Sequence, residues 1–284
     1  MNTLVDRRRV VVGYDGSAEA LAAVDWAAAE AERAQAQLQV VNAYRVAWPG
    51  AYYDIAPEMT EATARSAEEL VAEAVDRVRG RGTGLDVIGT AVDALPAATL
   101  LDVGDAGARL LVVGNRGAGG LTNLVMGSVS QQVATHAHVP VAVVRGRTTA
   151  TDGPVVVGTD DSPGSDTALG LAFEAARARG AGLVAIRAHV PPIRPVLPLS
   201  EIRAQEHAAL DASLARWAGK YPDVVLEARV AVGRAAKVLV GVSHTAQLVV
   251  VGSRGHGGFT GLLLGSVGQQ LMHHAECPVL IAHG

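Results

Sequence analysis

The chain has 284 residues, of which 49% are apolar and 18% are charged, and its formal net charge is −4. This length is enough for two ordinary domains, and the composition argues against a disordered chain. No apolar run approaches the ~20 residues of a membrane span, and the acidic balance without a long basic run argues against nucleic acid as a partner. The amino-terminal stretch has no apolar signal region, so we expect a cytoplasmic protein without a membrane span.

The predicted elements form the same series twice along the chain. In the first half we expect strands over 9–13, 38–43, 85–92, 109–114 and 139–144, and helices over 18–33, 60–79, 96–106 and 128–135. In the second half we expect strands over 155–159, 183–188, 224–232, 247–252 and 278–282, and helices over 166–179, 200–218, 235–243 and 266–273. Such alternation predicts, in each half, a parallel sheet with right-handed crossovers and helices on both faces.

The two halves are joined by the polar, patternless segment 145–153, which we interpret as a linker. We therefore expect a first domain over 1–147 and a second over 152–284. The match between the halves fails mainly in the Pro-rich segments 47–57 and 190–198, which are either lids over a ligand crevice or simple connections.

Each half opens with an apolar strand that runs into an aspartate, at Asp15 in the first and Asp160 in the second. In an open parallel sheet, ligands bind outside the carboxyl ends of the strands, where the strand order reverses. A carboxylate there can accept hydrogen bonds from ribose hydroxyls or a base amine. The alternative is that both aspartates serve the start of the next helix, where Ser17 and Ser162 are the expected caps.

A glycine-rich motif, G-x2-G-x9-G-S, follows the fourth strand of each half with identical spacing. Its members are Gly114, Gly117, Gly127 and Ser128, and again Gly252, Gly255, Gly265 and Ser266. We expect Gly114 and Gly252 to turn the chain off the strand, and Gly117 and Gly255 to let the backbone approach a phosphate. The helix N-terminus after the motif favours an anion. The alternative, glycine needed for loop geometry alone, is weakened by the duplication.

These motifs, with the V-V-V-G-x-D start and the H-A-x-x-P-V close of each half, resemble the universal stress protein family in its tandem-domain form. The resemblance implies two Rossmann-like domains, each a five-stranded parallel sheet of order 3-2-1-4-5, and ATP bound by members that carry the glycine motif. Carried over by motif, the first site comprises Gly13, Asp15, Val41, Gly114, Arg116, Gly117, Gly127, Ser128, Val129 and Ser130. The second comprises Gly158, Asp160, Ile186, Gly252, Arg254, Gly255, Gly265, Ser266, Val267 and Gly268.

The sequence departs from the family pattern at Asn115, where Ser is common, and at Gly268, which stands where the first half has Ser130. The change removes a hydroxyl that could reach a phosphate, so we expect the second site to bind more weakly or to depend more on a metal ion. We expect Mg²⁺ to be held through the ATP phosphates and not by protein ligands.

The chain contains no G-x4-G-K-[ST] motif, so no P-loop lysine reaches the phosphates. The nearest cations are Arg116 and Arg254, and the one candidate base in the loops, His256, has no counterpart in the first half. Because phosphoryl transfer depends on positioning and charge neutralisation, we predict ATP binding with slow hydrolysis or none, and no catalytic residue.

The leading hypothesis is a nucleotide-dependent stress-response and growth-regulating module. ATP occupancy would set its conformation or oligomeric state, such as a homodimer, toward a downstream protein partner. The alternatives are a slow ATPase or nucleotidyl-transfer enzyme that uses the same crevice, and a structural pseudo-site that holds no nucleotide. Cys277 is expected to be buried and not redox-active. The histidines at 136, 138, 273 and 274 suit helix C-terminal dipoles better than a zinc site.

Overall fold

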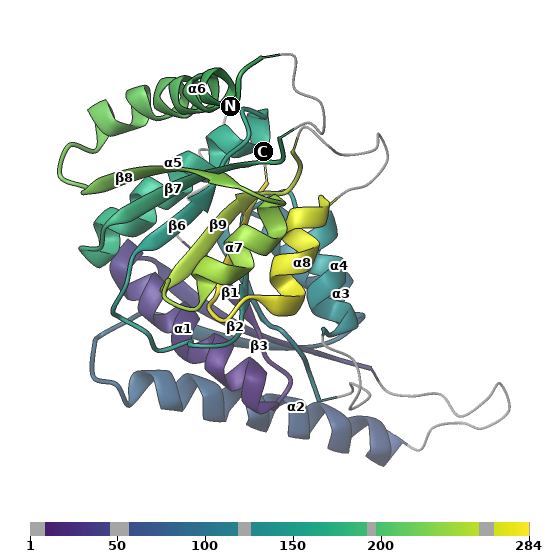
Figure 1. Ribbon diagram of the computed structural model, residues 1–284. Coiled ribbons are helices and arrows are strands. Elements are labelled where there is room, and N and C mark those ends of the chain that lie inside the picture. Colours follow the sequence, from purple (N-terminus) through teal and green to yellow (C-terminus); the bar gives the residue numbers. More distant parts are fainter. Residues whose placement is uncertain (1–8, 46–56, 119–125, 192–196, 256–263, 284) are drawn as a thin grey trace, which may run out of the picture. The chain divides into compact units, whose positions relative to one another are not determined.

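The computed structural model describes residues 9–45, 57–118, 126–191, 197–255 and 264–283. The chain divides into two compact units, Met1–Val144 and Arg145–Gly284 (Figure 1). The division falls at the amino end of the segment predicted to be a linker. The domain limits 1–147 and 152–284 stay a prediction.

The first unit alternates strands and helices throughout its described residues. The elements are β1 (Arg9–Gly13), α1 (Ala18–Ala34), β2 (Gln37–Tyr44), α2 (Pro57–Arg79), β3 (Val87–Asp93), α3 (Pro96–Asp105), β4 (Ala108–Gly114), α4 (Ser128–His136) and β5 (Val141–Val144). The strands pair in parallel in the order β3-β2-β1-β4-β5. The order reverses between β1 and β4, which places the ends of these two strands side by side.

The second unit repeats the series. Its elements are β6 (Val155–Gly158), α5 (Pro163–Arg179), β7 (Leu183–His189), α6 (Leu199–Lys220), β8 (Leu226–Val232), α7 (Ala235–Ser243), β9 (Leu248–Gly252), α8 (Ser266–His274) and β10 (Val279–Ala282). The parallel order is β8-β7-β6-β9-β10. The predicted fold, two Rossmann-like halves with sheet order 3-2-1-4-5, is confirmed.

Small shifts at element ends have local causes. Helix α5 begins at Pro163 instead of the predicted residue 166. Proline fits the first turn of a helix because its missing N–H has no helical partner there. The hydroxyl oxygen of Ser162 caps the same end by accepting from the N–H of Ser165 at 3.2 Å. Ser17 caps α1 in the same way through the N–H of Ala20, so both predicted caps are confirmed.

The core of the first unit is built on the central strands, which are buried on both faces. Val10, Val11 and Val12 of β1 are at most 1% exposed. Helices α1 and α2 pack together beside the sheet, and α3 and α4 form a second pair. Strands covered on both faces read as unbroken apolar runs, which is the pattern that predicted them.

The segment after β5 carries no helix or strand, but it is not a free linker. Arg145 donates from Nη1 to the carbonyl of Met272 at 2.5 Å. The N–H of Arg147 bonds the carbonyl of Glu276 at 2.8 Å, and its Nη1 bonds the carbonyl of His244 at 2.6 Å. The interpretation as a patternless connection is therefore incomplete, because these arginines satisfy carbonyls at the ends of α7 and α8.

Candidate functional site

A cavity of about 310 Å³ lies in the first unit at the carboxyl ends of β1 and β4. Its size is at the lower end of the ~300–1,000 Å³ usual for small-molecule pockets. The ten residues predicted for the first site all line it: Gly13, Asp15, Val41, Gly114, Arg116, Gly117, Gly127, Ser128, Val129 and Ser130. Positions separated by more than 100 residues in the chain thus converge on one space.

Asp15 joins the turn after β1 to the glycine-rich loop. Its Oδ1 accepts from the N–H and the hydroxyl of Ser17, at 3.1 and 2.6 Å. Its Oδ2 accepts from the N–H of Ala118 at 2.8 Å. The residue is exposed at the mouth of the cavity. The helix cap is Ser17, so the carboxylate of Asp15 is left to bridge two loops beside the cavity.

Asp160 holds the matching place in the second unit. Its Oδ1 accepts from the hydroxyl of Ser165 at 2.7 Å and from the N–H of Ser162 at 3.2 Å. Its Oδ2 lies where a Cβ atom at Gly255 would be, as the Oδ2 of Asp15 does at Gly117. The second glycine of each motif is therefore required by the strand-end aspartate of its own half.

The first glycine of each motif has a different role from the one predicted. Neither Gly114 nor Gly252 has a left-handed φ, so neither is needed to turn the chain. A Cβ atom at Gly114 would lie 2.8 Å from the carbonyl oxygen of Glu19, and one at Gly252 would lie 2.8 Å from the carbonyl carbon of Gly164. These glycines let the first turn of α1 or α5 pack directly on the end of the neighbouring strand.

Ser130 also differs from its predicted role. Its side chain is only 5% exposed, and its hydroxyl donates to the carbonyl of Gly114 at 2.6 Å. The hydroxyl thus ties α4 to the end of β4. Its replacement by Gly268 in the second unit removes a structural bond, and the argument that it removes a phosphate ligand is weakened.

The N-termini of α4 and α8 are open to an anion. Their N-cap residues, Gly127 and Gly265, offer no side-chain cap. The first backbone N–H groups of a helix have no partner within it, and the helix dipole adds positive potential there. The residues concerned are those of the predicted sites, namely Ser128, Val129 and Ser130, and Ser266, Val267 and Gly268.

Arg116, one of the two cations predicted near the phosphates, is half-exposed and paired. Its Nη2 lies 3.1 Å from Oε1 of Glu19 in α1. The charge that it offers to an anion in the cavity is therefore partly neutralised. Its counterpart Arg254 follows β9, where its carbonyl accepts from the hydroxyl of Ser162 at 3.4 Å.

Apolar side chains that the sequence did not point to form one wall of the cavity. Leu100 of α3 and Met126 are buried and line it together with Val41. The other lining residues that were not predicted are Tyr14, Ala20, Ala43, Pro96 and Val113. Burial, followed by the charges of Glu73 and Asp15, raises the pKa of Tyr14, so its phenol is neutral. The apolar spacing of the helix after the third strand was the signal that could have found Leu100.

The second set of predicted residues lies at the same edge of its own sheet. Gly158 ends β6 and pairs with Ile186 in the middle of β7. A Cβ atom at Gly158 would meet Leu239 as one at Gly13 would meet Leu100. Asp160 follows β6. Gly252 ends β9, and Arg254 and Gly255 follow it. His256 and the loop to residue 263 lie outside the described residues, as do 119–125 and most of the Pro-rich segments at 46–56 and 192–196.

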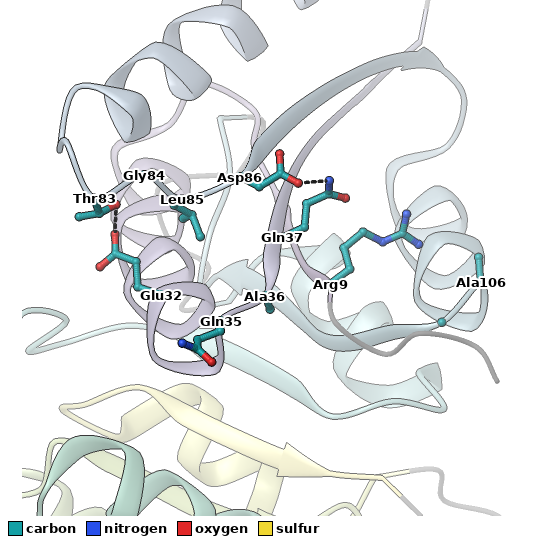
Figure 2. A pocket seen from close by; sticks show the side chains of 11 residues that line it. Arg9, Glu32, Gln35, Ala36, Gln37, Thr83, Gly84, Leu85, Asp86 and Ala106 are labelled. Carbon is teal, nitrogen blue, oxygen red and sulfur yellow. Dashed lines mark hydrogen bonds between the residues drawn. The ribbon is translucent and has the colours of Figure 1, made fainter.

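A larger hollow, about 940 Å³, lies at the opposite, amino-terminal edge of the first sheet (Figure 2). Its polar side chains are largely paired with one another. Gln37 donates to Oδ2 of Asp86 at 2.6 Å, and Thr83 donates to Oε1 of Glu32 at 3.0 Å. The C-termini of α1 and α3 border it, and ligands of open parallel sheets bind at the other edge. We therefore assign the ligand site to the smaller cavity.

The fold and the duplicated strand-end motif define a two-part α/β protein of doubly wound sheets, with a cavity at the carboxyl edge of the first sheet. The model of the universal stress protein family matches residues 6–145 and 153–283. A universal stress protein of Mycolicibacterium smegmatis is 39% identical over 284 residues, which cover 96% of each chain. One of Mycobacterium tuberculosis is 37% identical over 287 residues, with the same coverage. The chain belongs to the universal stress protein family.

A solved structure agrees on the fold. The crystal structure of a universal stress protein from Archaeoglobus fulgidus matches 98% of each chain with a TM-score of 0.71 at 18% identity. In the described part of this chain, no helix is long and apolar enough to cross a membrane. The same residues contain no group of three or more His, Cys, Asp and Glu side chains arranged to hold a metal ion.

Proposed function

We propose that the first-unit cavity holds ATP and that the matching edge of the second unit holds another. The observation that carries this proposal is the convergence of the ten predicted residues on one cavity. The cavity also has the three surfaces that a nucleotide needs. Val41, Leu100 and Met126 offer an apolar wall to the base, and Asp15 offers a carboxylate to ribose hydroxyls.

The phosphates are assigned to the N-terminus of α4 and the backbone around Gly117. This end of the helix has no side-chain cap, and the glycine permits close approach of the chain. Mg²⁺, when bound with the nucleotide, neutralises phosphate charge and is assigned to the phosphates themselves. Arg116 contributes a further, partly neutralised positive charge.

The residues that line the cavity favour binding of ATP without its hydrolysis. The described residues that line the cavity include no lysine and no histidine, and their one carboxylate is that of Asp15, which is assigned to the ribose. We infer that nucleotide occupancy is the signal, in a cytoplasmic stress-response and growth-regulating protein. A homodimer and a downstream protein are its proposed partners.

The test is to denature the purified protein and identify the small molecule that is released, with its ratio to the chain. ATP retained for hours with Mg²⁺, up to two per chain, supports the proposal. ADP with steady phosphate release supports a slow ATPase instead. Wild-type protein that neither carries nor binds ATP, ADP or another nucleotide in titration overturns the proposal.

Variants assign the site. Gly117→Ala and Asp15→Glu should weaken binding in the first half, and Gly255→Ala and Asp160→Glu should weaken it in the second. Gly241→Ala is the control, because the added Cβ at this helical position meets no atom within 4 Å apart from the neighbouring backbone of its own helix. Unchanged ATP affinity in all four site variants would show that the nucleotide binds elsewhere on the molecule.

A further inference from the structure

The turns after the first strand of each half have different conformational constraints. Residues 14–17 read Tyr-Asp-Gly-Ser and residues 159–162 read Thr-Asp-Asp-Ser. Gly16 has a φ of +84°, in the left-handed region, and Asp161 has a φ of +62° at the matching position. Among the described residues, Asp161 and Gln35 are the only non-glycine residues with a positive φ. A non-glycine residue is held in this region only when its surroundings favour it.

Asp161 belongs to an ion-pair network that has no counterpart among the described residues of the first half. Arg187, at the end of β7, lies with Nη1 2.6 Å from Oδ2 of Asp161, and its Nε donates to Oε2 of Glu206 in α6. The Arg187 side chain is only 16% exposed. Burial lowers the pKa of Arg187, while its hydrogen bond to Glu206 and its ion pair with Asp161 raise it, with a net upward direction. The guanidinium is therefore charged and clamps the turn to two elements.

The matching position in the first half is Asn42, which carries no charge. It is buried and donates from Nδ2 to the carbonyl of Tyr14 at 2.7 Å. It contacts the backbone before Asp15 but does not hold the residue that follows. The first turn therefore has a glycine where the second has the Arg187-paired Asp161, and Asn42 adds only a neutral bond to its backbone. A glycine at this position leaves the turn more conformations to lose on binding.

A second difference lies at Ser165, which stands where the first half has Ala20. The Ser165 hydroxyl accepts from the N–H of Asp160 at 2.9 Å and donates to Oδ1 of the same residue at 2.7 Å. Ser165 is only 3% exposed. In the first half, Asp15 receives its hydroxyl bond from Ser17, which is only partly buried. Asp160 is thus held by a buried partner at both its backbone and its carboxylate.

We propose that Arg187, Asp161, Glu206 and Ser165 are positioning residues of the second nucleotide site, which they hold in binding geometry before the ligand arrives. This inference rests on the proposed function. It makes the second half the preorganised, tighter site and the first half the adaptable one, because a rigid turn loses less conformational freedom on binding. It reverses the expectation drawn from Gly268 alone.

The test measures ATP affinity of each half separately, in full-length protein. The ATP affinity of the second half is measured in the Gly117→Ala variant, whose first site is weakened. The affinity of the first half is measured in Gly255→Ala, whose second site is weakened. We expect the second half to bind more tightly. Adding Asp161→Asn to Gly117→Ala keeps a residue that tolerates left-handed φ but removes the charge. We expect this change, and separately Ser165→Ala, to weaken ATP binding about tenfold. A tenfold loss of affinity corresponds to the free energy of about one hydrogen bond to a charged group.

A matched control and a ligand-free readout separate positioning from general stability. Glu227→Gln breaks the exposed Glu227–Arg229 pair of the same unit and should leave the affinity unchanged. In nucleotide-free protein, amide hydrogen exchange should be slower at 159–162 than at 14–17, and Asp161→Asn should remove the difference. Arg187→Gln should act in the same direction, and Asp161→Asn gives the answer if that variant does not fold.

Equal exchange in the two turns, or affinity within twofold of the parent in both Asp161→Asn and Ser165→Ala, would overturn the inference while ATP binding stands. Tighter binding by the first half would do the same. Absence of nucleotide binding in wild-type protein, by contrast, would remove the proposed function itself.

Discussion

The carboxylate of Asp15 occupies the space that a Cβ atom at Gly117 would need. Its Oδ2 accepts the N–H of the next residue, Ala118, at 2.8 Å. Asp160 and Gly255 stand in the same relation in the second half. The strand-end aspartate and the second glycine of the loop are therefore one structural unit, used twice, that brings two loops together beside the proposed phosphate site.

This relationship predicts that Gly117→Ala and Asp15→Ala are energetically coupled. Gly117 has no left-handed φ, so alanine clashes with the Asp15 carboxylate and not with its own backbone conformation. We expect Gly117→Ala to lower the free energy of unfolding by about 1–3 kcal/mol. In an Asp15→Ala background its cost should fall below about 0.5 kcal/mol. Urea unfolding of the wild type, the two single variants and the double variant gives the coupling energy of this double-mutant cycle. Additive losses of stability in the double variant would contradict the contact.

A second prediction concerns Gly170 in α5, which packs against a tryptophan. A Cβ atom there would lie 2.6 Å from Cη2 of Trp217. The ring cannot move freely, because its Nε1 donates to Oδ1 of Asp166 at 3.0 Å and its face stacks on Tyr221. Gly170→Ala should destabilise the protein by about 1–3 kcal/mol through overpacking.

The control for Gly170 is Gly241→Ala in α7, where the new methyl group meets no atom within 4 Å apart from the neighbouring backbone of its own helix. Alanine is favoured over glycine within a helix by roughly 0.5–1 kcal/mol, so this variant should be stabilised. Thermal unfolding of both variants gives the comparison. A Gly170→Ala protein as stable as Gly241→Ala would show that the tryptophan packs elsewhere.

Cys277 should be chemically silent in the folded protein. Its side chain is fully buried, and burial raises the pKa of the thiol to about 12. Since the thiolate is the reactive form, we expect negligible reaction with a thiol reagent at pH 8 and one thiol per chain after unfolding in urea. Rapid reaction under native conditions would mean that the end of the second unit opens.

His273 should make stability depend on pH. Burial, followed by the charges of His274 and Arg145, lowers the pKa of His273. The helix dipole, which suggested a favourable place for a charged histidine, is not the dominant influence. Because the unfolded state takes up the proton first, this stabilising contribution is complete above the ordinary pKa of about 6.5 and is lost as the pH falls below it.

The measurement is the urea midpoint of the wild type and of His273→Gln between pH 7.5 and 5. The wild type should lose more stability toward pH 5 than the variant does. His244→Gln, at an exposed histidine of the same unit, serves for comparison. Equal pH dependence of the wild type and His273→Gln would contradict the environment described for this side chain.

The amino-acid sequence was sufficient to predict the fold and the duplication, and the ten residues predicted for the first site line one cavity. Runs such as 10–12 are apolar without alternation because both faces of a central parallel strand are covered, so they mark strands directly. A cap such as Ser17 bonds a backbone N–H only three residues away, so it can be recognised from a short stretch of sequence. The glycine spacing and the strand-end aspartates then located the edge at which the cavity lies.

The contacts that each of these residues makes are visible only in the three-dimensional structure. Position 114 requires glycine because the carbonyl of Glu19 lies where a Cβ atom would be. The Ser130 hydroxyl donates its hydrogen bond to the carbonyl of Gly114. Arg187 reaches Asp161 and Glu206, which lie 26 and 19 positions away along the chain. Periodicity and spacing report local geometry, whereas these contacts depend on how close two helices approach the end of a strand. The distance between helix and strand end is set by the packing of residues far apart in the chain, so no single stretch of sequence predicts it.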